Sequence, residues 1–490
     1  MTALWVLAPV LLPALAAGAC LLLRHRSAMP RVALAGAVSG AVAAFALAMR
    51  AVGGGPFVTA AGWLHADGLS ALVSVIGGGV LVATLLHARS YLAVLPALEP
   101  GDGGWAPGRW EATMLGLAAC VQLSAVSNNL GLLWIALEGA TLASAVLVGY
   151  YRRTDALEAA WKYLLLCSVG IALALFATVL LHYAAVSRIG EVGGGLEWTT
   201  LRDAAAALDP RFVRLAFLFA LVGWGAKIGL APMHAWVPDA YGRAPAPASA
   251  LLSTAVTAAG VAALLRFATV ARTALGPEWP ERWLALFGVV SVVVAVPFLV
   301  AQSEYKRLLA WSSVKHTGLV VLAAGLGTPL ALFGGLLHLL SQSAAKSLGF
   351  MLGGHLLRAS GSHRLDHCQG VLAADRGLGT LLLVTGVGLT GLPPSATFLS
   401  QWLTLAGGFT GPRPVFAAVA LIALAAGFLG LVFHWVCMLT GPAREGFTDA
   451  MPRSARAPLW AMAVVLVALG VWLPAPVRAL LESAVQAVRP

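Results

Sequence analysis

The stretch GAKIGLAPMHAW, residues 225–236, places a lysine and a proline inside one apolar segment. It continues the run LAFLFALVGW (215–224), so Lys227 is expected to lie within a membrane. A lysine at mid-bilayer costs roughly 2.5–3.5 kcal/mol on insertion scales, and an interior proline such as Pro232 costs about 3 kcal/mol in an ordinary helix. Two costly residues this close together indicate a functional break in a membrane-spanning helix.

The composition is that of a polytopic membrane protein. Of the 490 residues 60% are hydrophobic and 10% are charged, whereas soluble domains contain about 25% charged residues. Long continuous apolar stretches recur along the chain, which favours α-helices over the alternating strands of a barrel. We therefore expect an all-α bundle with short loops. The predicted spans, fourteen in all, are 3–23, 32–52, 69–88, 111–127, 129–150, 161–186, 212–231, 245–268, 282–302, 306–326, 329–357, 377–410, 414–440 and 457–475.

Charge and cysteine content narrow the possible functions. The net charge of +11 indicates membrane topology rather than nucleic-acid binding. The loop at 24–31 (RHRSAMPR) is basic and no Lys or Arg precedes the first span, so the positive-inside rule puts the N-terminus outside and this loop in the cytoplasm. The first apolar segment is too long for a signal peptide, and we expect it to be retained.

The five cysteines form no CxxC pair, and no nucleotide loop, nucleophile triad or zinc motif is readable. We expect no bond-making chemistry, no metal and no cofactor on this chain.

The helix break has a counterpart in the second half of the chain. GLAP (229–232) and GLPP (391–394, with Pro393 and Pro394) each interrupt the fourth span of a five-span set. Gly and Pro are common in membrane helices generally, but matching interruptions in two halves are typical of inverted-repeat transporters. The expected organisation is an N-terminal three-helix segment (1–110), a first five-helix repeat (111–268), a second, inverted five-helix repeat (282–440) and a C-terminal helix (441–490).

Ionisable residues inside the predicted spans are the candidate site. Glu138 (in LLWIALEGATLAS) is centred in the fifth span, and Lys227 in the seventh is its natural partner. A moving proton makes or breaks such an ion pair, which would give a reversible electrostatic switch. Glu138 is the only clear mid-span carboxylate, so a proton path is favoured over a sodium site. Asp67, which opens the third span, is interpreted as a helix cap.

The tenth and eleventh spans supply further candidates. Lys315 and His316 lie well inside the tenth span. His338, Gln342 and Lys346 share one face of the eleventh span, over about 12 Å at 1.5 Å per residue. Such a stripe can simply join helices, but a His and a Lys at this spacing favour a hydrated proton relay. His355, near the end of this span, is interpreted as interfacial.

Five stretches make the chain resemble the antiporter-like, proton-conducting membrane subunits shared by respiratory complex I, group 4 membrane-bound hydrogenases and Mrp-type cation/proton antiporters. The likeness covers roughly residues 60–440, and within it the sequence of 134–175 most resembles the hydrogenase-4 F-type subunit. The stretches are WIALEGATLASAVLVGYYR (134–152), LEAAWKYLLLCSVGIALAL (157–175), GAKIGLAPMHAWVPDAYGRAPAPASALLS (225–253), YKRLLAWSSVKHTG (305–318) and HLLSQSAAKSLGF (338–350).

The resemblance implies a role for the candidate residues. Glu138 and Lys227 correspond to the family's glutamate and lysine in spans 5 and 7, His338 and Lys346 to its span-11 polar axis, and His316 to a span-10 histidine of some members. The implied function is proton translocation driven by a partner redox module. The implied setting is the cytoplasmic (inner) membrane of a bacterium or archaeon, beside other membrane subunits of an oxidoreductase complex.

Three positions depart from the family pattern. Ala258 stands where many members have a span-8 lysine or other polar residue, Gln342 replaces a frequent histidine, and Gln401 replaces the titratable residue of the second broken helix. Glutamine orders water but cannot hold or release a proton. Two alternatives therefore stay open: a subunit of an Mrp-type cation/proton antiporter or an inorganic-carbon uptake system, and a structural subunit with an incomplete proton path.

Overall fold

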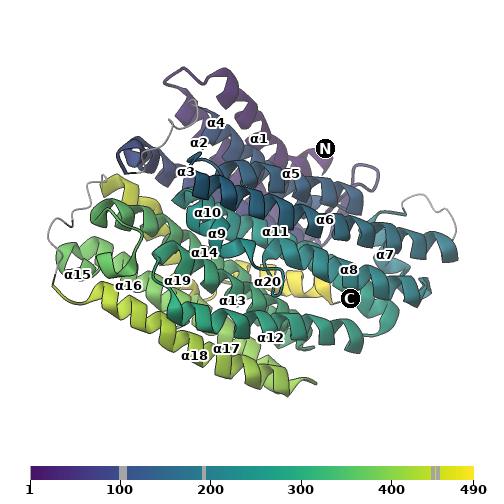
Figure 1. Ribbon diagram of the computed structural model, residues 1–490. Coiled ribbons are helices and arrows are strands. Elements are labelled where there is room, and N and C mark those ends of the chain that lie inside the picture. Colours follow the sequence, from purple (N-terminus) through teal and green to yellow (C-terminus); the bar gives the residue numbers. More distant parts are fainter. Residues whose placement is uncertain (1, 99–107, 190–194, 443–446, 448–452, 490) are drawn as a thin grey trace.

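The computed structural model describes residues 2–98, 108–189, 195–442, 447 and 453–489, and these are almost entirely helical (Figure 1). The helices of the first half are α1 (Thr2–Leu22), α2 (Met29–Gly54), α3 (Gly68–Leu98), α4 (Arg109–Val126), α5 (Leu130–Val148), α6 (Thr154–Ile189), α7 (Trp198–Asp203), α8 (Pro210–Ile228), α9 (Trp236–Arg243), α10 (Ala246–Leu251) and α11 (Thr257–Leu275). Those of the second half are α12 (Glu278–Ala301), α13 (Tyr305–Gly325), α14 (Pro329–Ser360), α15 (Val371–Ala374), α16 (Arg376–Thr390), α17 (Ala396–Phe409), α18 (Pro414–Leu439), α19 (Ala457–Val471) and α20 (Ala475–Val488).

Short elements complete the fold. Strands β1 (Phe57–Thr59) and β2 (Leu64–Ala66) form an antiparallel hairpin between α2 and α3. Three 3-10 turns, η1 (Ala205–Ala207), η3 (Leu365–His367) and η4 (Arg453–Arg456), lie in connections, whereas the π-helical segment η2 (Leu252–Val256) joins α10 to α11 inside one continuous span. Figure 1 shows that the long helices lie side by side in one bundle.

Each of the fourteen predicted spans coincides with a helix or a helix pair. Among the described residues, nine helices are long and apolar enough to cross a membrane, or ten if the bent pair α19–α20 is counted as one span. This confirms a multi-pass all-α membrane protein, whereas fourteen crossings remain a prediction. Helix α14 is not among the nine, because the stripe of His338, Gln342 and Lys346 makes it less apolar.

The two predicted helix breaks have the same local geometry. Helix α8 ends at Gly229 with φ +73°, and α16 ends at Gly391 with φ +78°, both in the left-handed region that glycine adopts without steric cost. At each end the following amide bonds a carbonyl five residues back: Leu230 to Gly225 at 2.8 Å, and Leu392 to Val387 at 2.9 Å. This is the Schellman termination, followed in both cases by proline, which cannot continue a helix.

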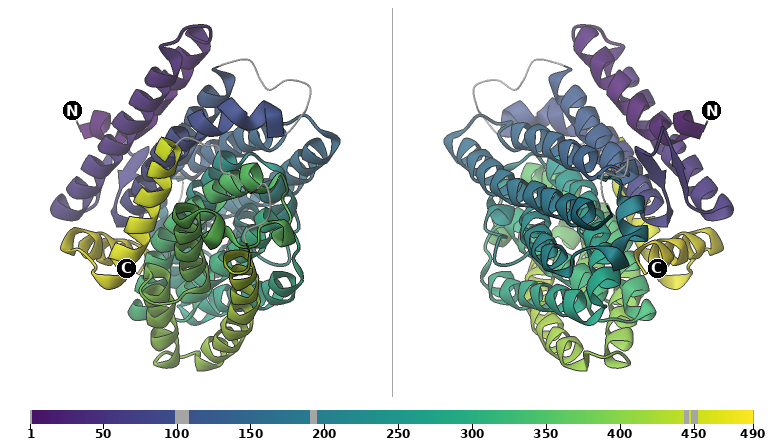
Figure 2. Two further views of the ribbon diagram at one scale, coloured as in Figure 1. Left: turned by 90° about the vertical axis from the view of Figure 1, so that its left-hand side faces the viewer. Right: turned by 90° about the vertical axis from the view of Figure 1, so that its right-hand side faces the viewer.

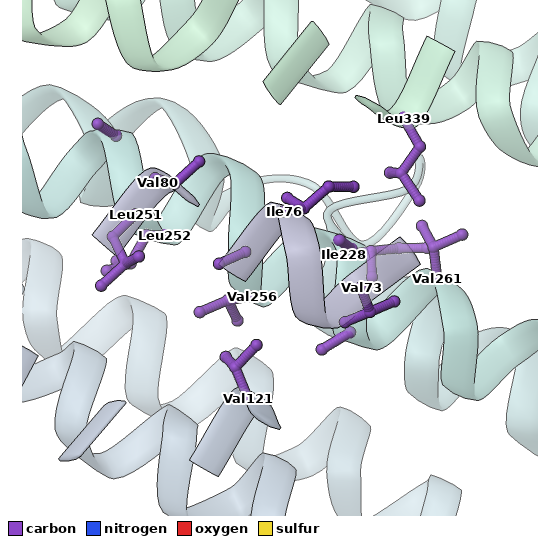
Figure 3. Packing of buried hydrophobic residues seen from close by; sticks show 14 of the residues in the cluster. Val73, Ile76, Val80, Val121, Ile228, Leu251, Leu252, Val256, Val261 and Leu339 are labelled. Carbon is purple, nitrogen blue, oxygen red and sulfur yellow. The ribbon is translucent and has the colours of Figure 1, made fainter. Parts of the chain in front are cut away.

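The core lies at the centre of the bundle, where α10, α11, α13 and α14 bury almost all their side chains and α3 buries most of those described, up to Leu92. Figure 3 shows Val73 and Ile76 of α3 packed near Ile228 and Val261, directly beside the first helix break. Helices α6, α12 and α18 instead expose large apolar side chains outward, as expected for surfaces that face lipid or another membrane subunit. The hairpin of α1 and α2 forms one edge of the molecule (Figure 2).

The chain after α18 contains two helices in place of the single one expected. Helix α20 follows α19 after a bend of 78°, at the segment that contains Pro474. It packs along α3, and a Cβ atom at Gly68 would lie 2.3 Å from the backbone nitrogen of Ala484. Helix α1 begins and α20 ends at the same end of the bundle, which we call the α20 end (Figures 1 and 2). The opposite end, where α1 meets α2, is called the loop 24–31 end.

Candidate functional site

Lys227 occupies a buried site lined by hydroxyl groups. Its side chain is 1% exposed and lies one residue before the end of α8, at the first helix break. The Nζ atom donates hydrogen bonds to Oγ1 of Thr141 in α5, at 2.7 Å, and to the hydroxyl of Tyr163 in α6, at 2.8 Å. The Tyr163 hydroxyl also bonds Ser144 at 2.7 Å. The lysine is therefore held by neutral groups supplied by two neighbouring helices.

Glu138 lies one helical turn before Thr141 on α5 and is half-buried. Ser168 of α6 donates to its Oε1 atom at 3.4 Å, while Oε2 is buried without a hydrogen-bond partner. Within the described part of the chain, no ion pair joins Glu138 to Lys227. The pairing expected from the sequence is thus not formed directly, because Lys227 binds the hydroxyls of Thr141 and Tyr163 instead.

The second half contains a chain of three buried side chains. The Nδ1 atom of His316 in α13 lies 2.8 Å from Nε2 of His338 in α14. The other ring nitrogen of His338, Nδ1, lies 2.8 Å from the hydroxyl of Ser400 in α17. Both histidines are fully buried. These contacts form a continuous hydrogen-bonded line from α13 to the second broken helix.

Two buried lysines flank this line, and backbone carbonyls hold both of them. Lys315 donates to the carbonyl of Leu389 at 3.1 Å, near the end of α16. In an unbroken helix that carbonyl would accept from the amide of residue 393, but Pro393 has no N–H, so the break frees the carbonyl for Lys315. Lys346 donates to Ser313 at 2.5 Å and to the carbonyl of Leu309 at 2.9 Å, both on α13.

The three positions expected to depart from the family pattern lie on α14, α17 and α11. Gln342 sits between His338 and Lys346 on α14, and both polar atoms of its buried amide are without a partner. Gln401 packs against the second break, since a Cβ atom at Gly391 would lie 2.4 Å from its Oε1 atom. Ala258 is fully buried in α11, just after the π-helical segment η2. The predicted candidates therefore gather in two clusters, and the intervening helix carries an alanine.

The structure also defines the surroundings of Asp67 and His355. Asp67 does cap α3, accepting from the amide of Ser70 at 2.9 Å, and it also pairs with the buried Arg266. Burial alone would raise the pKa of the Asp67 carboxyl, but Arg266 and His65 outweigh it and hold that pKa below its usual range. His355, interpreted from the sequence as interfacial, lies near the end of α14 and is fully buried against α3, with its ring 5.3 Å from that of His87.

The hydroxyl groups of Thr141, Tyr163, Ser313 and Ser400 are the contacts that the sequence did not identify. All four lie in or beside the stretches that contain the charged candidates, and Ser400 directly precedes Gln401. The sequence did not single out these four hydroxyl groups, because hydroxyl side chains are frequent in membrane helices and usually bond their own backbone.

The sequence of this chain is similar to one protein-family model and to several named proteins. The family model described as "NADH:quinone oxidoreductase/Mrp antiporter, TM" matches residues 127–429. The chain is 33% identical to the hydrogenase-4 component F homolog of Methylacidiphilum infernorum over 83% of this chain and 85% of the relative. It is 34% identical to NADH-quinone oxidoreductase subunit 14 of Thermus thermophilus over 74% of this chain and 78% of the relative.

Solved structures show the same arrangement of helices. A chain of respiratory complex I from Thermus thermophilus superimposes with a TM-score of 0.74 at 29% identity, covering 94% of this chain and 97% of that one. A chain of the archaeal membrane-bound sulfane sulfur reductase superimposes with a TM-score of 0.87 at 22% identity, covering 99% and 97%. At 22% identity, the likeness to the sulfane sulfur reductase chain concerns the fold alone.

Proposed function

Because this chain belongs to the family of NADH:quinone oxidoreductase and Mrp antiporter membrane subunits, we propose that it translocates protons in a complex I-like or hydrogenase-like redox assembly. Several relatives are named as subunits of such complexes. Redox chemistry and its cofactors are assigned to partner subunits. The chain would cross the inner membrane of a bacterium or archaeon fourteen times, as two inverted repeats with the N-terminus outside.

The observation that carries the proposal is the site of Lys227. Removing a charged ammonium group from water is costly unless charged or hydrogen-bonding partners compensate. Thr141 and Tyr163 supply two hydrogen bonds but no negative charge, so the charged and neutral forms of the lysine are more evenly balanced than beside a carboxylate. Such a group takes up and releases a proton when its surroundings change. Glu138, one turn away on α5, would supply or receive that proton.

The second cluster would continue the path toward the outer side. Each histidine ring has one nitrogen that can donate and one that can accept, so His316, His338 and Ser400 can pass a proton along their hydrogen bonds. The unpaired amide of Gln342 supports water between His338 and Lys346, since buried polar atoms are nearly always hydrogen-bonded. The proposed ion is H⁺ rather than Na⁺.

The direct test is Lys227→Met in the complete native complex, reconstituted into vesicles, with proton movement followed by a pH-sensitive dye during turnover. We expect proton translocation to fall to background and Glu138→Gln to have a similar effect. Lys162→Met is the matched control, because Lys162 is exposed and pairs with Glu158 and Asp239 at the surface of α6. Wild-type proton translocation by Lys227→Met, with all subunits present, would refute the proposal.

A second candidate function is proton translocation by the first half alone, through the Lys227 cluster and without the His338 cluster. It is favoured by the neutral residues Gln342 and Gln401 in the second half, and by Ala258 in the helix between the two clusters, each at a position where a polar or titratable residue was expected. His338→Leu separates the two candidates: a complete path predicts loss of translocation, as for Lys227→Met. A path confined to the first half predicts that His338→Leu translocates protons normally while Lys227→Met does not.

A further inference from the structure

A groove opens at the loop 24–31 end of the bundle, between α1, α4 and the end of α5. Its volume is about 550 Å³. The floor is apolar and formed by Gly18, Leu21, Ala112 and Val146, which lie one to four residues inside the ends of their helices. At Gly18 a Cβ atom would meet no other atom within 4 Å, so the helices are separated there rather than packed. The groove therefore lies where α1, which packs against α4, leaves space beside the end of α5.

Two arginines stand at the rim of the groove, Arg109 and Arg152. Both are exposed, and neither forms an ion pair or a side-chain hydrogen bond within the described residues. Arg109 is the first residue of α4. The Glu111 carboxylate in the same turn accepts hydrogen bonds from the backbone amides of Gly108 and Glu111, and it lines a neighbouring pocket rather than this groove. Among the described residues that line this groove there is no carboxylate, so the charge on its lining is positive.

The arrangement matches one kind of ligand. Guanidinium groups bind phosphate through paired hydrogen bonds, and the apolar floor beside them accommodates hydrocarbon. The floor opens to the side of the bundle, since Leu21 and Val146 are 50% and 47% exposed. Helix ends are also the level at which headgroups meet a membrane protein, and basic pockets between membrane helices bind anionic headgroups.

We propose that this groove binds one anionic phospholipid, with the phosphate between Arg109 and Arg152 and an acyl chain along the floor. The site is separate from the Lys227 and His338 clusters, so it does not depend on the proposed proton path. A soluble phosphate would use the rim alone, whereas a lipid uses the rim and the floor together. The lipid would hold the α1–α2 hairpin, which forms one edge of the molecule, against α4 and α5.

The test uses the complete complex, purified in mild detergent and examined by native mass spectrometry with added phosphatidylglycerol. Arg109→Gln/Arg152→Gln removes the charges, and Gly18→Leu fills the floor where there is room for a side chain. We expect about a 30-fold weaker retention for the double variant, at about fivefold for each arginine, and loss of the bound lipid for Gly18→Leu. Phosphatidylcholine should not replace phosphatidylglycerol, and millimolar inorganic phosphate should not displace it.

Two controls match these changes. Arg26→Gln removes an exposed arginine from the same end of the bundle, and Gly53→Leu adds the same side chain at another open glycine; both should retain the lipid. Equal lipid retention by the wild type and both groove variants would overturn the proposal. Displacement of the lipid by inorganic phosphate alone would also overturn it, because that result indicates a site that binds only a headgroup. Loss of a protein subunit with unchanged lipid retention would overturn it as well, because that result indicates a protein occupant.

Discussion

Replacing Tyr163 by Phe removes one hydroxyl from the surroundings of Lys227 and leaves the ring in place. That hydroxyl lies 2.8 Å from Nζ, and Thr141 at 2.7 Å would remain as the other side-chain partner. A hydrogen bond to a charged group contributes about 1.5–3 kcal/mol, which corresponds to about a 10- to 150-fold change in equilibrium. The proton-bound form of Lys227 would be disfavoured by that factor. Ser144 keeps its bond to the carbonyl of Thr141, so the local fold should persist.

We expect Tyr163→Phe to lower proton translocation at neutral pH by at least fivefold, and the rate to recover as the pH is lowered. The sign follows from the chemistry, because each unit of pH supplies tenfold more protons to refill a weakened site. The assay is dye-detected proton uptake by vesicles containing the complete complex, measured from pH 5.5 to 8. Tyr183→Phe, on the same helix but half exposed, is the matched control. A wild-type rate and pH profile for Tyr163→Phe would refute the reasoning about the Lys227 site.

Three further predictions address the second break and the buried ion pair. Gly391→Ala should destabilise the protein by about 1–2 kcal/mol through its left-handed backbone, plus a clash with Gln401; Gln401→Ala should restore part of the loss in thermal unfolding of the purified complex. Asp67→Asn should destabilise by about 3–5 kcal/mol because it leaves Arg266 buried without its partner. That loss should be seen as a lower Tm at neutral pH and fade only under strong acid, where the wild-type carboxyl is also protonated. Ser400→Ala should slow proton translocation several-fold without a change in Tm, in the vesicle assay.

The sequence predicted the helices and their breaks well, because apolar length and Gly–Pro interruptions act locally. A glycine that adopts the left-handed region, followed closely by a proline without an N–H, ends the helix at both sites, so GLAP and GLPP could be located from the chain alone. Proline without such a glycine does not end a helix here, since Pro9, Pro13 and Pro297 lie inside helices. The face shared by His338, Gln342 and Lys346 follows from helix geometry in the same way. These predictions needed no knowledge of which helices are neighbours.

The contacts between helices could not be predicted, since they depend on rotation and depth. Glu138 and Lys227 were expected to pair because their charges are opposite. Thr141 and Tyr163 bind the lysine instead, because their hydroxyls face α8 at the level of the Nζ atom. His355 lies near the end of a span in the sequence, but α14 continues to Ser360 and α3 covers that part of it. Local patterns carry no information about such coverage.

The direct contact between His316 and His338 has a consequence for how protons pass along the proposed path. The bond between the two rings holds a single hydrogen atom, so one ring donates and the other accepts at any moment. After a proton has moved along the line from His316 through His338 to Ser400, every hydrogen bond in the line points the opposite way. The rings must reorient or exchange tautomers before the next proton can follow. The line therefore transfers one proton at a time, and its hydrogen bonds must reorient before each further transfer.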